Sequence, residues 1–189
     1  LDEAREAMRR VVRDGNRASE VITRIRALMT NGEPSRAPVD LNELIRETLA
    51  LTQHELSRRH ITLLTTLAPD LPHVSADRVQ LQQVLLNLVM NALDSLGSVE
   101  NRERILQVRT SQRDPGLVVV AVEDNGVGFA PGGTERLFEA FYTTKAQGLG
   151  MGLALSRSIV EAHGGHLEAI RNAGFGVTFQ FILPLQREA

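Results

Sequence analysis

The sequence has no cysteine, no long apolar run and no large excess of charge of either sign. The absence of cysteine excludes disulfides, cysteine-ligated zinc and thiol catalysis. No apolar run reaches the roughly 18 residues of a transmembrane helix, and the opening LDEAREAMRR is not a signal peptide. A formal net charge of −2 removes the electrostatic case for binding nucleic acid. We therefore expect a soluble, cytoplasmic chain without direct membrane contact, which leaves open a membrane anchor upstream of it.

The 189 residues, 42% of them hydrophobic, suffice for one large domain or for one domain with an appendage. Steps of three and four separate the apolar residues of the first segment: Leu1, Ala4, Met8, Val11, Gly15, Ala18, Ile22, Ile25 and Met29. This spacing predicts a bundle helix over residues 1–31, which cannot bury its apolar face alone. Residues 32–38 (GEPSRAP) resemble a linker, and residues 39–186 then form the main domain.

In the main domain, helical and strand patterns alternate. Asp40 and Glu43 predict a capping box for a helix over 41–59, and Ser75 is expected to cap a long helix over 76–96. A third helix is predicted over 152–163. The expected strands are 61–67, 105–111, 117–123, 166–171 and 176–183, with a hairpin between the second and the third. The fold class is therefore α+β: a two-layer sandwich of one mixed sheet with helices on one face.

Two asparagines on the long predicted helix are the first candidate for chemistry. Asn87 and Asn91 are four residues apart and therefore share a helix face, beside apolar positions. Buried amides need hydrogen-bond partners, so both can be purely structural. Their carbonyl oxygens are equally suitable as hard ligands for a Mg²⁺ ion that carries nucleotide phosphates. The pair alone leaves both interpretations open.

Three glycine-containing segments follow the long helix. Asp124-Asn-Gly-Val-Gly128 comes directly after an apolar strand, where a tight turn is the ordinary interpretation. Residues 148–156 (GLGMGLALS) open a helix, and glycine N–H groups at a helix N-terminus can bind phosphate. Lys145 can add a positive charge there or remain a solvated loop lysine. The segment from Gly174 to Thr178 forms a turn between the last strands. Each segment alone is a weak signal.

Together, in this order and spacing, these segments resemble the N box, first glycine box, F box, second glycine box and final glycine–threonine motif of sensor histidine kinases. These kinases belong to the ATPase/kinase superfamily shared with gyrase, Hsp90 and the mismatch-repair ATPases. Residues 1–31 resemble the second helix of the dimerisation and phosphotransfer hairpin, and the main domain resembles the complete catalytic domain, which has a Bergerat-type ATP-binding fold. His163-Gly-Gly and the run from Phe141 to Lys145 are most similar to the nitrogen- and oxygen-sensing subgroup.

The resemblance implies a role for each matching residue. Asp124 would accept the adenine amino group, and Thr178 would support that carboxylate. Asn91 would ligate Mg²⁺, with Asn87 one turn earlier on the phosphate-facing side, and these two asparagines are the expected catalytic residues. Gly126 and Gly128 would make room for adenine and ribose. The full set of expected ATP-binding residues is Asn87, Asn91, Asp94, Asp124, Gly126, Gly128, Thr143, Thr144, Lys145, Gly148, Leu149, Gly150, Met151, Gly152, Leu153 and Thr178.

A mobile lid is also implied, over residues 139–150. It would close over the triphosphate with the backbone N–H groups of Gly148 to Gly152, and Phe138 and Phe141 would anchor it against the domain.

The expected reaction depends on position 87. In the hydrolysing relatives a glutamate at this place activates water, whereas Asn87 is a neutral amide that cannot act as a general base. We therefore expect phosphoryl transfer from ATP to a protein histidine, driven by positioning and electrostatics. The alternatives are an ATP hydrolase or serine-directed kinase of the same superfamily, and a nonenzymatic dimerisation module.

None of the five histidines matches the phosphoacceptor pattern of the family. His54-Glu55 is a superficial match, but it follows the linker and lacks a proline at the right distance. His60 and His73 are expected at the surface, and His163 and His166 in a cationic or capping role after a helix. We therefore expect a fragment that binds ATP or ADP but cannot phosphorylate itself. The implied partners are a response-regulator receiver domain, an upstream sensor domain and a second copy bound through the bundle helix.

Overall fold

The computed structural model describes residues 36–113, 116–129, 136–143 and 150–185. The chain divides between Glu33 and Pro34 into two units, and everything below belongs to the second. The predicted bundle helix lies outside the described residues, as does the turn at 114–115. Within the described ranges, no helix combines the length and apolarity needed to cross a membrane.

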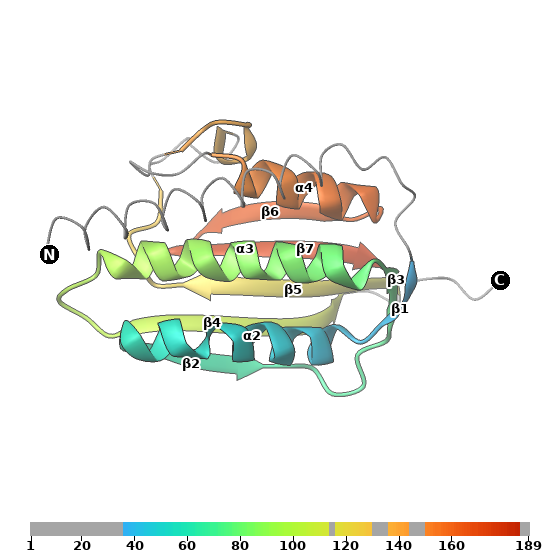
Figure 1. Ribbon diagram of the computed structural model, residues 1–189, viewed down its shortest axis with the longest axis horizontal. Coiled ribbons are helices and arrows are strands. Elements are labelled where there is room, and N and C mark those ends of the chain that lie inside the picture. Colours follow the sequence, from blue (N-terminus) through green and yellow to red (C-terminus); the bar gives the residue numbers. More distant parts are fainter. Residues whose placement is uncertain (1–35, 114–115, 130–135, 144–149, 186–189) are drawn as a thin grey trace, which may run out of the picture. The chain divides into compact units, whose positions relative to one another are not determined.

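A five-stranded mixed sheet forms one layer of the domain, in the order β2-β4-β5-β7-β6 (Figure 1). Its strands are β2 (Ile61–Thr66), β4 (Arg104–Arg113), β5 (Leu117–Asp124), β6 (His166–Arg171) and β7 (Val177–Pro184). Strands β2 and β4 pair in parallel, and the other three pairings are antiparallel. The second layer consists of α2 (Leu41–Arg58), α3 (Arg78–Gly97) and α4 (Gly152–Ala162), which cover one face of the sheet. The predicted α+β sandwich is confirmed.

The central strand β5 shows how the sequence determines which face is buried. Val118, Val120 and Val122 belong to the core cluster beneath the helices, whereas the residues between them do not. Because side chains alternate along a strand, Asp124 falls on the same face as these valines, at the end of the strand. The apolar residues of α3 that face the sheet, from Leu81 to Leu96, complete this core.

A second, two-stranded sheet was not predicted. It pairs β1 (Ala37–Val39) with β3 (Val74–Ala76). Its presence corrects the expected start of the long helix, because Ser75 lies within β3. Asp77 is the N-cap of α3, and its carboxylate accepts hydrogen bonds from Val79 N at 3.0 Å and Gln80 N at 3.1 Å. Both side chains can cap a helix, so composition alone could not separate them. At α2 the predicted cap is confirmed, since Glu43 N donates to Asp40 Oδ1 at 3.0 Å.

The C-terminal end of α4 is held by two side chains. Arg36 Nη2 donates to the carbonyl oxygen of Ala162 at 2.7 Å, where a cation is favoured by the helix dipole. His163 is buried, and its Nε2 accepts the N–H of Asp77 at 2.9 Å while its Nδ1 lies 2.8 Å from Ile159 O. Accepting at Nε2 and donating at Nδ1 requires the neutral tautomer. Of the two roles expected of His163, the capping role fits, since its Nδ1 meets a carbonyl group in the last turn of α4, and Arg36 supplies the positive charge at this end.

We predict that His163→Ala lowers the free energy of unfolding by about 2–3 kcal/mol, because it leaves a cavity and removes the partner of the Asp77 N–H. Urea denaturation followed by circular dichroism measures the loss. His166→Ala is the control, since His166 is exposed in the next strand and its removal should change the value by about 0.5 kcal/mol or less. Equal effects from the two variants would contradict this role for His163.

Candidate functional site

A stripe of polar residues follows one face of α3. Asn87 Nδ2 donates to Ser156 Oγ of α4 at 2.8 Å, and a Cβ on Gly152 would overlap Asn87 Oδ1. The first turn of α4 therefore rests directly on Asn87. Asn91, half-buried, follows one turn later, and Asp94 next on the exposed side of the same face. The predicted shared face of Asn87 and Asn91 is confirmed by the helix that contains both.

The carboxylate of Asp124 lies at the other end of this stripe. Asp124 is 1% exposed, and its Oδ1 accepts hydrogen bonds from Gly126 N at 2.8 Å and Ser95 Oγ at 3.0 Å. Burial raises the pKa of Asp124 to about 6, against the opposing effect of these two hydrogen bonds. From Asn87 to Ser95 the helix rises about 12 Å. The face of α3 thus connects a buried acceptor at one end with the glycine-opened start of α4 at the other.

The expected contact between Thr178 and Asp124 is wrong. The residue paired with Asp124 across the sheet is Val177, whereas Thr178 pairs with Glu123. Because side chains alternate, Thr178 lies on the opposite face of the sheet. Its hydroxyl donates to Asn172 Oδ1 at 2.8 Å. The sequence motif was correctly located, but a shift of one residue on a strand reverses the face.

Asn172 links the turn between β6 and β7 to the end of β5, and sequence reasoning missed it. Its Nδ2 donates to the carbonyl oxygen of Asp124 at 3.1 Å and to that of Phe175 at 3.3 Å. In the same turn Gly176 has φ +83°, and a Cβ there would overlap Asp124 O. This turn therefore packs directly on the main chain of the buried aspartate. An asparagine just before a glycine-rich turn was the available signal.

Gly126 lies where the loop after β5 packs against α3. A Cβ on Gly126 would overlap Ser95 Oγ and come within 2.7 Å of Asp124 Oδ1. Its missing side chain therefore lets the loop after β5 approach α3, so that the Gly126 N–H reaches the carboxylate. Gly128 is in the left-handed region, at φ +66°, beside Gly176. The protein itself therefore requires glycine at position 126, and the room expected for adenine and ribose stays a prediction.

The loop after β5 is also held by Arg102, another residue that sequence reasoning missed. Its Nε and Nη2 donate to the carbonyl oxygen of Asn125 at 3.1 and 2.7 Å, and Nη2 donates to that of Gly126 at 3.0 Å. The guanidinium also lies over the ring of Phe175, 3.8 Å from its centroid. A lone arginine between a helix and a strand gives no sequence signal for such a role.

The lid region is described only in part. Phe138 lies in the 3-10 helix η2 (Arg136–Phe138), is 6% exposed, and packs edge-to-face on Phe179 with ring centroids 6.4 Å apart. The guanidinium of Arg157 lies 3.9 Å from its ring centroid. The anchoring role expected of Phe138 fits this packing, but that of Phe141 is wrong. Phe141 is 75% exposed and has φ +69°, so its ring points away from the core.

The remaining predicted ATP-binding residues lie in the lid or at the start of α4. Thr143 is exposed, whereas Gly150, Met151 and Leu153 are half-buried around the start of α4. Met151 occupies the N-cap position without a hydrogen-bonding side chain, so the first N–H groups of α4 can receive an anion. Four of the predicted residues lie outside the described part of the chain: Thr144, Lys145, Gly148 and Leu149.

Comparison with known proteins supplies the family. Residues 76–187 match the family described as histidine kinase-, DNA gyrase B-, and HSP90-like ATPase. The chain belongs to this family. The sensor protein FixL of Bradyrhizobium diazoefficiens is 39% identical over 182 residues, which are 96% of this chain and 36% of FixL. The sensor protein TdiS of Thauera aromatica is 35% identical over 90% of this chain and 31% of its own length. The chain thus spans about a third of these relatives.

Solved structures give the same assignment for the fold. The catalytic domain of histidine kinase ThkA superposes with a TM-score of 0.71 at 32% identity, over 79% of this chain and 95% of that domain. Full-length ShkA in complex with AMPPNP gives a TM-score of 0.76 at 30% identity, over 89% and 35%. ThkA in complex with the response regulator TrrA gives 0.73 at 27% identity, over 91% and 49%. Asp124 and the stripe on α3 therefore belong to a histidine kinase catalytic domain.

The donor groups of this kinase domain suit a magnesium ion that is shared with phosphates. Among the described residues, no three His, Cys, Asp or Glu side chains are grouped to hold a metal. The side chains on the stripe at this point are the amides of Asn87 and Asn91, whose oxygens are hard ligands. Mg²⁺ typically takes few protein ligands and completes its shell with phosphate and water. The amide oxygens on this face are therefore of a type that fits Mg²⁺ arriving with a nucleotide.

We predict that Arg102→Met lowers the free energy of unfolding of the kinase domain by about 1–2 kcal/mol, because two loop carbonyl groups lose a charged donor. Methionine keeps much of the packing on Phe175, so the loss reports mainly the hydrogen bonds. Arg113→Met at the exposed end of β4 removes the same charge and serves as control. Thermal denaturation of both variants measures the difference, and equal melting temperatures would contradict the role of Arg102.

Proposed function

We propose that this chain binds Mg·ATP between α3, the start of α4 and the buried Asp124, and transfers the γ-phosphoryl group to a histidine side chain. The observation that carries the proposal is that one face of α3 contacts both Asp124, through Ser95, and the start of α4, through Asn87. Asp124 is a buried acceptor that can take the adenine amino group, which a guanine ring lacks at that position. The start of α4 offers N–H groups to phosphate at the other end of this face, and the rise of about 12 Å along α3 between Asn87 and Ser95 suits a nucleotide triphosphate.

Transfer to a side chain, rather than to water, is supported by the residues beside the phosphate end. Asn87 stands one turn before Asn91, and its amide is engaged with Ser156. An amide cannot remove a proton from water, so a water molecule near the γ-phosphate has no general base in Asn87. In this proposal Asn91 holds Mg²⁺, the ion neutralises phosphate charge, and the N–H groups of α4 orient the triphosphate for in-line attack.

The phosphoacceptor in this proposal is none of the five histidines of the chain. His163 is buried with both ring nitrogens in hydrogen bonds, and the other four are exposed at scattered positions. We propose that the acceptor lies on a helix that pairs with residues 1–31, and that the phosphoryl group then passes to a response-regulator aspartate. The solved complex of ThkA with TrrA supports such a partner. A sensor domain upstream and a homodimer through the bundle helix belong to the same proposal.

Calorimetry and transfer assays test this function. We expect ATP to bind with Mg²⁺ present, and GTP to bind at least tenfold more weakly. Labelled ATP should leave this chain unlabelled but label an added hairpin that carries an acceptor histidine. Asn91→Asp serves as the variant, since it keeps the shape of the side chain and alters the metal site. Phosphate release as fast as transfer would favour an ATP hydrolase and would contradict the kinase assignment.

A further inference from the structure

Asp94 adds a negative charge to a face that should receive a triphosphate. It follows Asn91 by three residues on α3, so the two side chains are neighbours on the helix surface. Its side chain is 40% exposed. A nucleotide bound along this face, as proposed above, would place several phosphate charges within one or two helical turns of this carboxylate. Unless the carboxylate is neutralised, it should repel the nucleotide.

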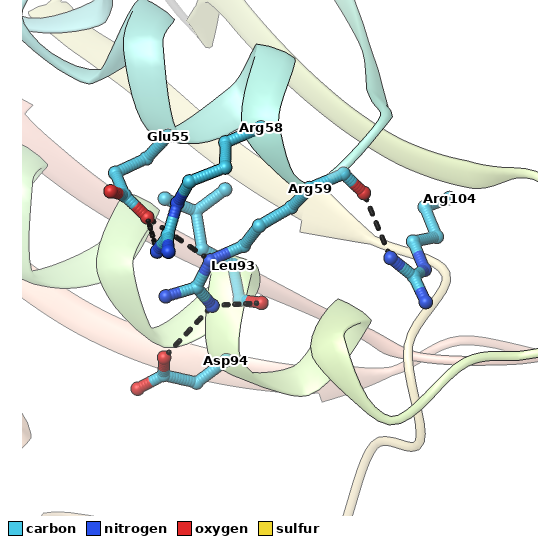
Figure 2. Close-up of polar contacts among 6 residues, drawn as sticks. All are labelled: Glu55, Arg58, Arg59, Leu93, Asp94 and Arg104. Carbon is cyan, nitrogen blue, oxygen red and sulfur yellow. Dashed lines mark hydrogen bonds and ion pairs between the residues drawn. The ribbon is translucent and has the colours of Figure 1, made fainter.

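Arg59, the C-cap residue of α2, pairs with this carboxylate. Arg59 Nη1 lies 3.3 Å from Asp94 Oδ1 and donates to the carbonyl oxygen of Leu93 at 3.1 Å (Figure 2). Its Nε donates to Glu55 Oε2 at 3.2 Å, so three acceptors fix the guanidinium. The main chain of Arg59 is fixed as well, since its carbonyl oxygen accepts from Arg104 Nη1 at 2.8 Å. A side chain held in this way loses little additional entropy when it pairs with Asp94.

The neighbouring Arg58 makes a useful comparison. Arg58 Nη2 lies 2.6 Å from the same Glu55 carboxylate, and this hydrogen bond is the main reason that the pKa of Glu55 is lowered. The side chain of Arg58 is 62% exposed, compared with 26% for Arg59. In Figure 2 the guanidinium of Arg59, and not that of Arg58, is joined to Asp94. The two arginines thus carry the same charge and share one partner, but they differ in their relation to α3.

We propose that Arg59 is a positioning residue for nucleotide binding that acts through Asp94. Arg59 offsets the charge of the Asp94 carboxylate and fixes its position near the C-terminal end of α3. The face of α3 that carries Asn91 and Asp94 then presents no net negative charge to the triphosphate. The proposal rests on the function proposed above. The proposal also predicts that substituting Asp94 changes ATP affinity in the direction opposite to that expected for a direct nucleotide ligand. Removing the Asp94 charge should strengthen ATP binding, whereas removing a ligand would weaken it.

Calorimetry with ATP and with ADP, at low and at high salt, tests the proposal. Arg59→Met should weaken ATP binding about tenfold at low ionic strength, since it removes a positive charge from beside the Asp94 carboxylate. The loss should be smaller for ADP, which carries less charge, and it should shrink in about 0.5 M salt. Asp94→Asn alone should tighten ATP binding. The double variant Arg59→Met/Asp94→Asn should bind ATP within about twofold of Asp94→Asn.

Arg58→Met is the matched control, because it removes the same charge and the same Glu55 contact without touching Asp94. It should bind ATP within about twofold of the wild type, and thermal denaturation checks that every variant is folded. Weaker binding by Asp94→Asn would overturn the proposal, as would a double variant that is as weak as Arg59→Met. If Arg59→Met does not fold, Asp94→Asn alone still decides by the sign of its effect. A wild type that does not bind ATP would refute the proposed function itself, which separates the two failures.

Discussion

Asp124→Asn is expected to weaken ATP binding by about 30- to 100-fold, the loss that follows from removing a charge-assisted hydrogen bond. In the proposed site the carboxylate accepts the adenine amino group while it also accepts from Gly126 N and Ser95 Oγ. Asparagine has one acceptor oxygen and adds an N–H₂ group. If the oxygen keeps the Gly126 N–H, the new donor faces the adenine amino group. Isothermal calorimetry measures the loss, and unchanged affinity would contradict the adenine assignment.

The same substitution should stabilise the protein without nucleotide at neutral pH. The pKa of Asp124 is raised from 3.8 to about 6 by burial, so the folded state favours the protonated form. This preference stabilises the fold fully below pH 3.8 and is lost as the pH rises through about 6. The loss amounts to about 3 kcal/mol, because each pKa unit corresponds to roughly 1.4 kcal/mol.

Asparagine does not titrate, so Asp124→Asn escapes that loss. Urea denaturation at pH 4 and at pH 7.5 should show that the free energy of unfolding of the variant increases relative to that of the wild type as the pH rises. A difference in stability that is independent of pH would contradict the raised pKa. The wild type therefore retains a costly buried charge, as expected where a carboxylate serves a ligand rather than the fold.

Gly176→Ala has the second large expected effect, on stability. Gly176 has φ +83°, and a Cβ there would overlap the carbonyl oxygen of Asp124. The substitution should therefore lower the free energy of unfolding by about 2–4 kcal/mol, from backbone strain together with displacement of the end of β5. Nucleotide binding should fall with it, because the displaced main chain carries the Asp124 side chain.

Gly174→Ala is the control for this prediction, because it lies in the same turn and a Cβ there would meet nothing within 4 Å. It should change stability by about 0.5 kcal/mol or less. Urea denaturation of both variants measures the contrast. A Gly174→Ala variant as unstable as Gly176→Ala would mean that the turn is sensitive to any side chain, and the specific approach to Asp124 would then be refuted.

Patterns that depend on local spacing were predicted correctly from sequence. The helix periods, the β4–β5 hairpin and the shared face of Asn87 and Asn91 all follow from the order of side chains within one element. The wrong predictions concerned residues whose position depends on how their segment pairs with another strand. Ser75 could not be rejected as a cap without knowing that β3 pairs with β1, and Thr178 could not be assigned a face without the register against β5.

Long side chains that reach across the fold were beyond sequence reasoning for a related reason. Arg59 contacts Asp94, which lies 35 positions further along the chain. Arg102 contacts residues 125 and 126, which lie 23 and 24 positions further along. Nothing in the residues around each arginine distinguishes it from a solvated surface residue. Phe141 shows the reverse case, since an apolar residue in a recognised motif proved to be exposed.

The hydrogen bond from Arg36 to α4 has a consequence for the design of chimeric kinases. Arg36 lies within the predicted linker, yet it binds the last carbonyl group of α4, and β1 begins at the next residue. Helix α4 is thereby fixed at one end by Arg36 and His163 and at the other by Asn87. A chimera that joins this catalytic domain to a foreign sensor should therefore be fused before Arg36. A junction at residue 39 would discard both Arg36 and β1, and α4 would lose one of the two side chains that hold its C-terminal end.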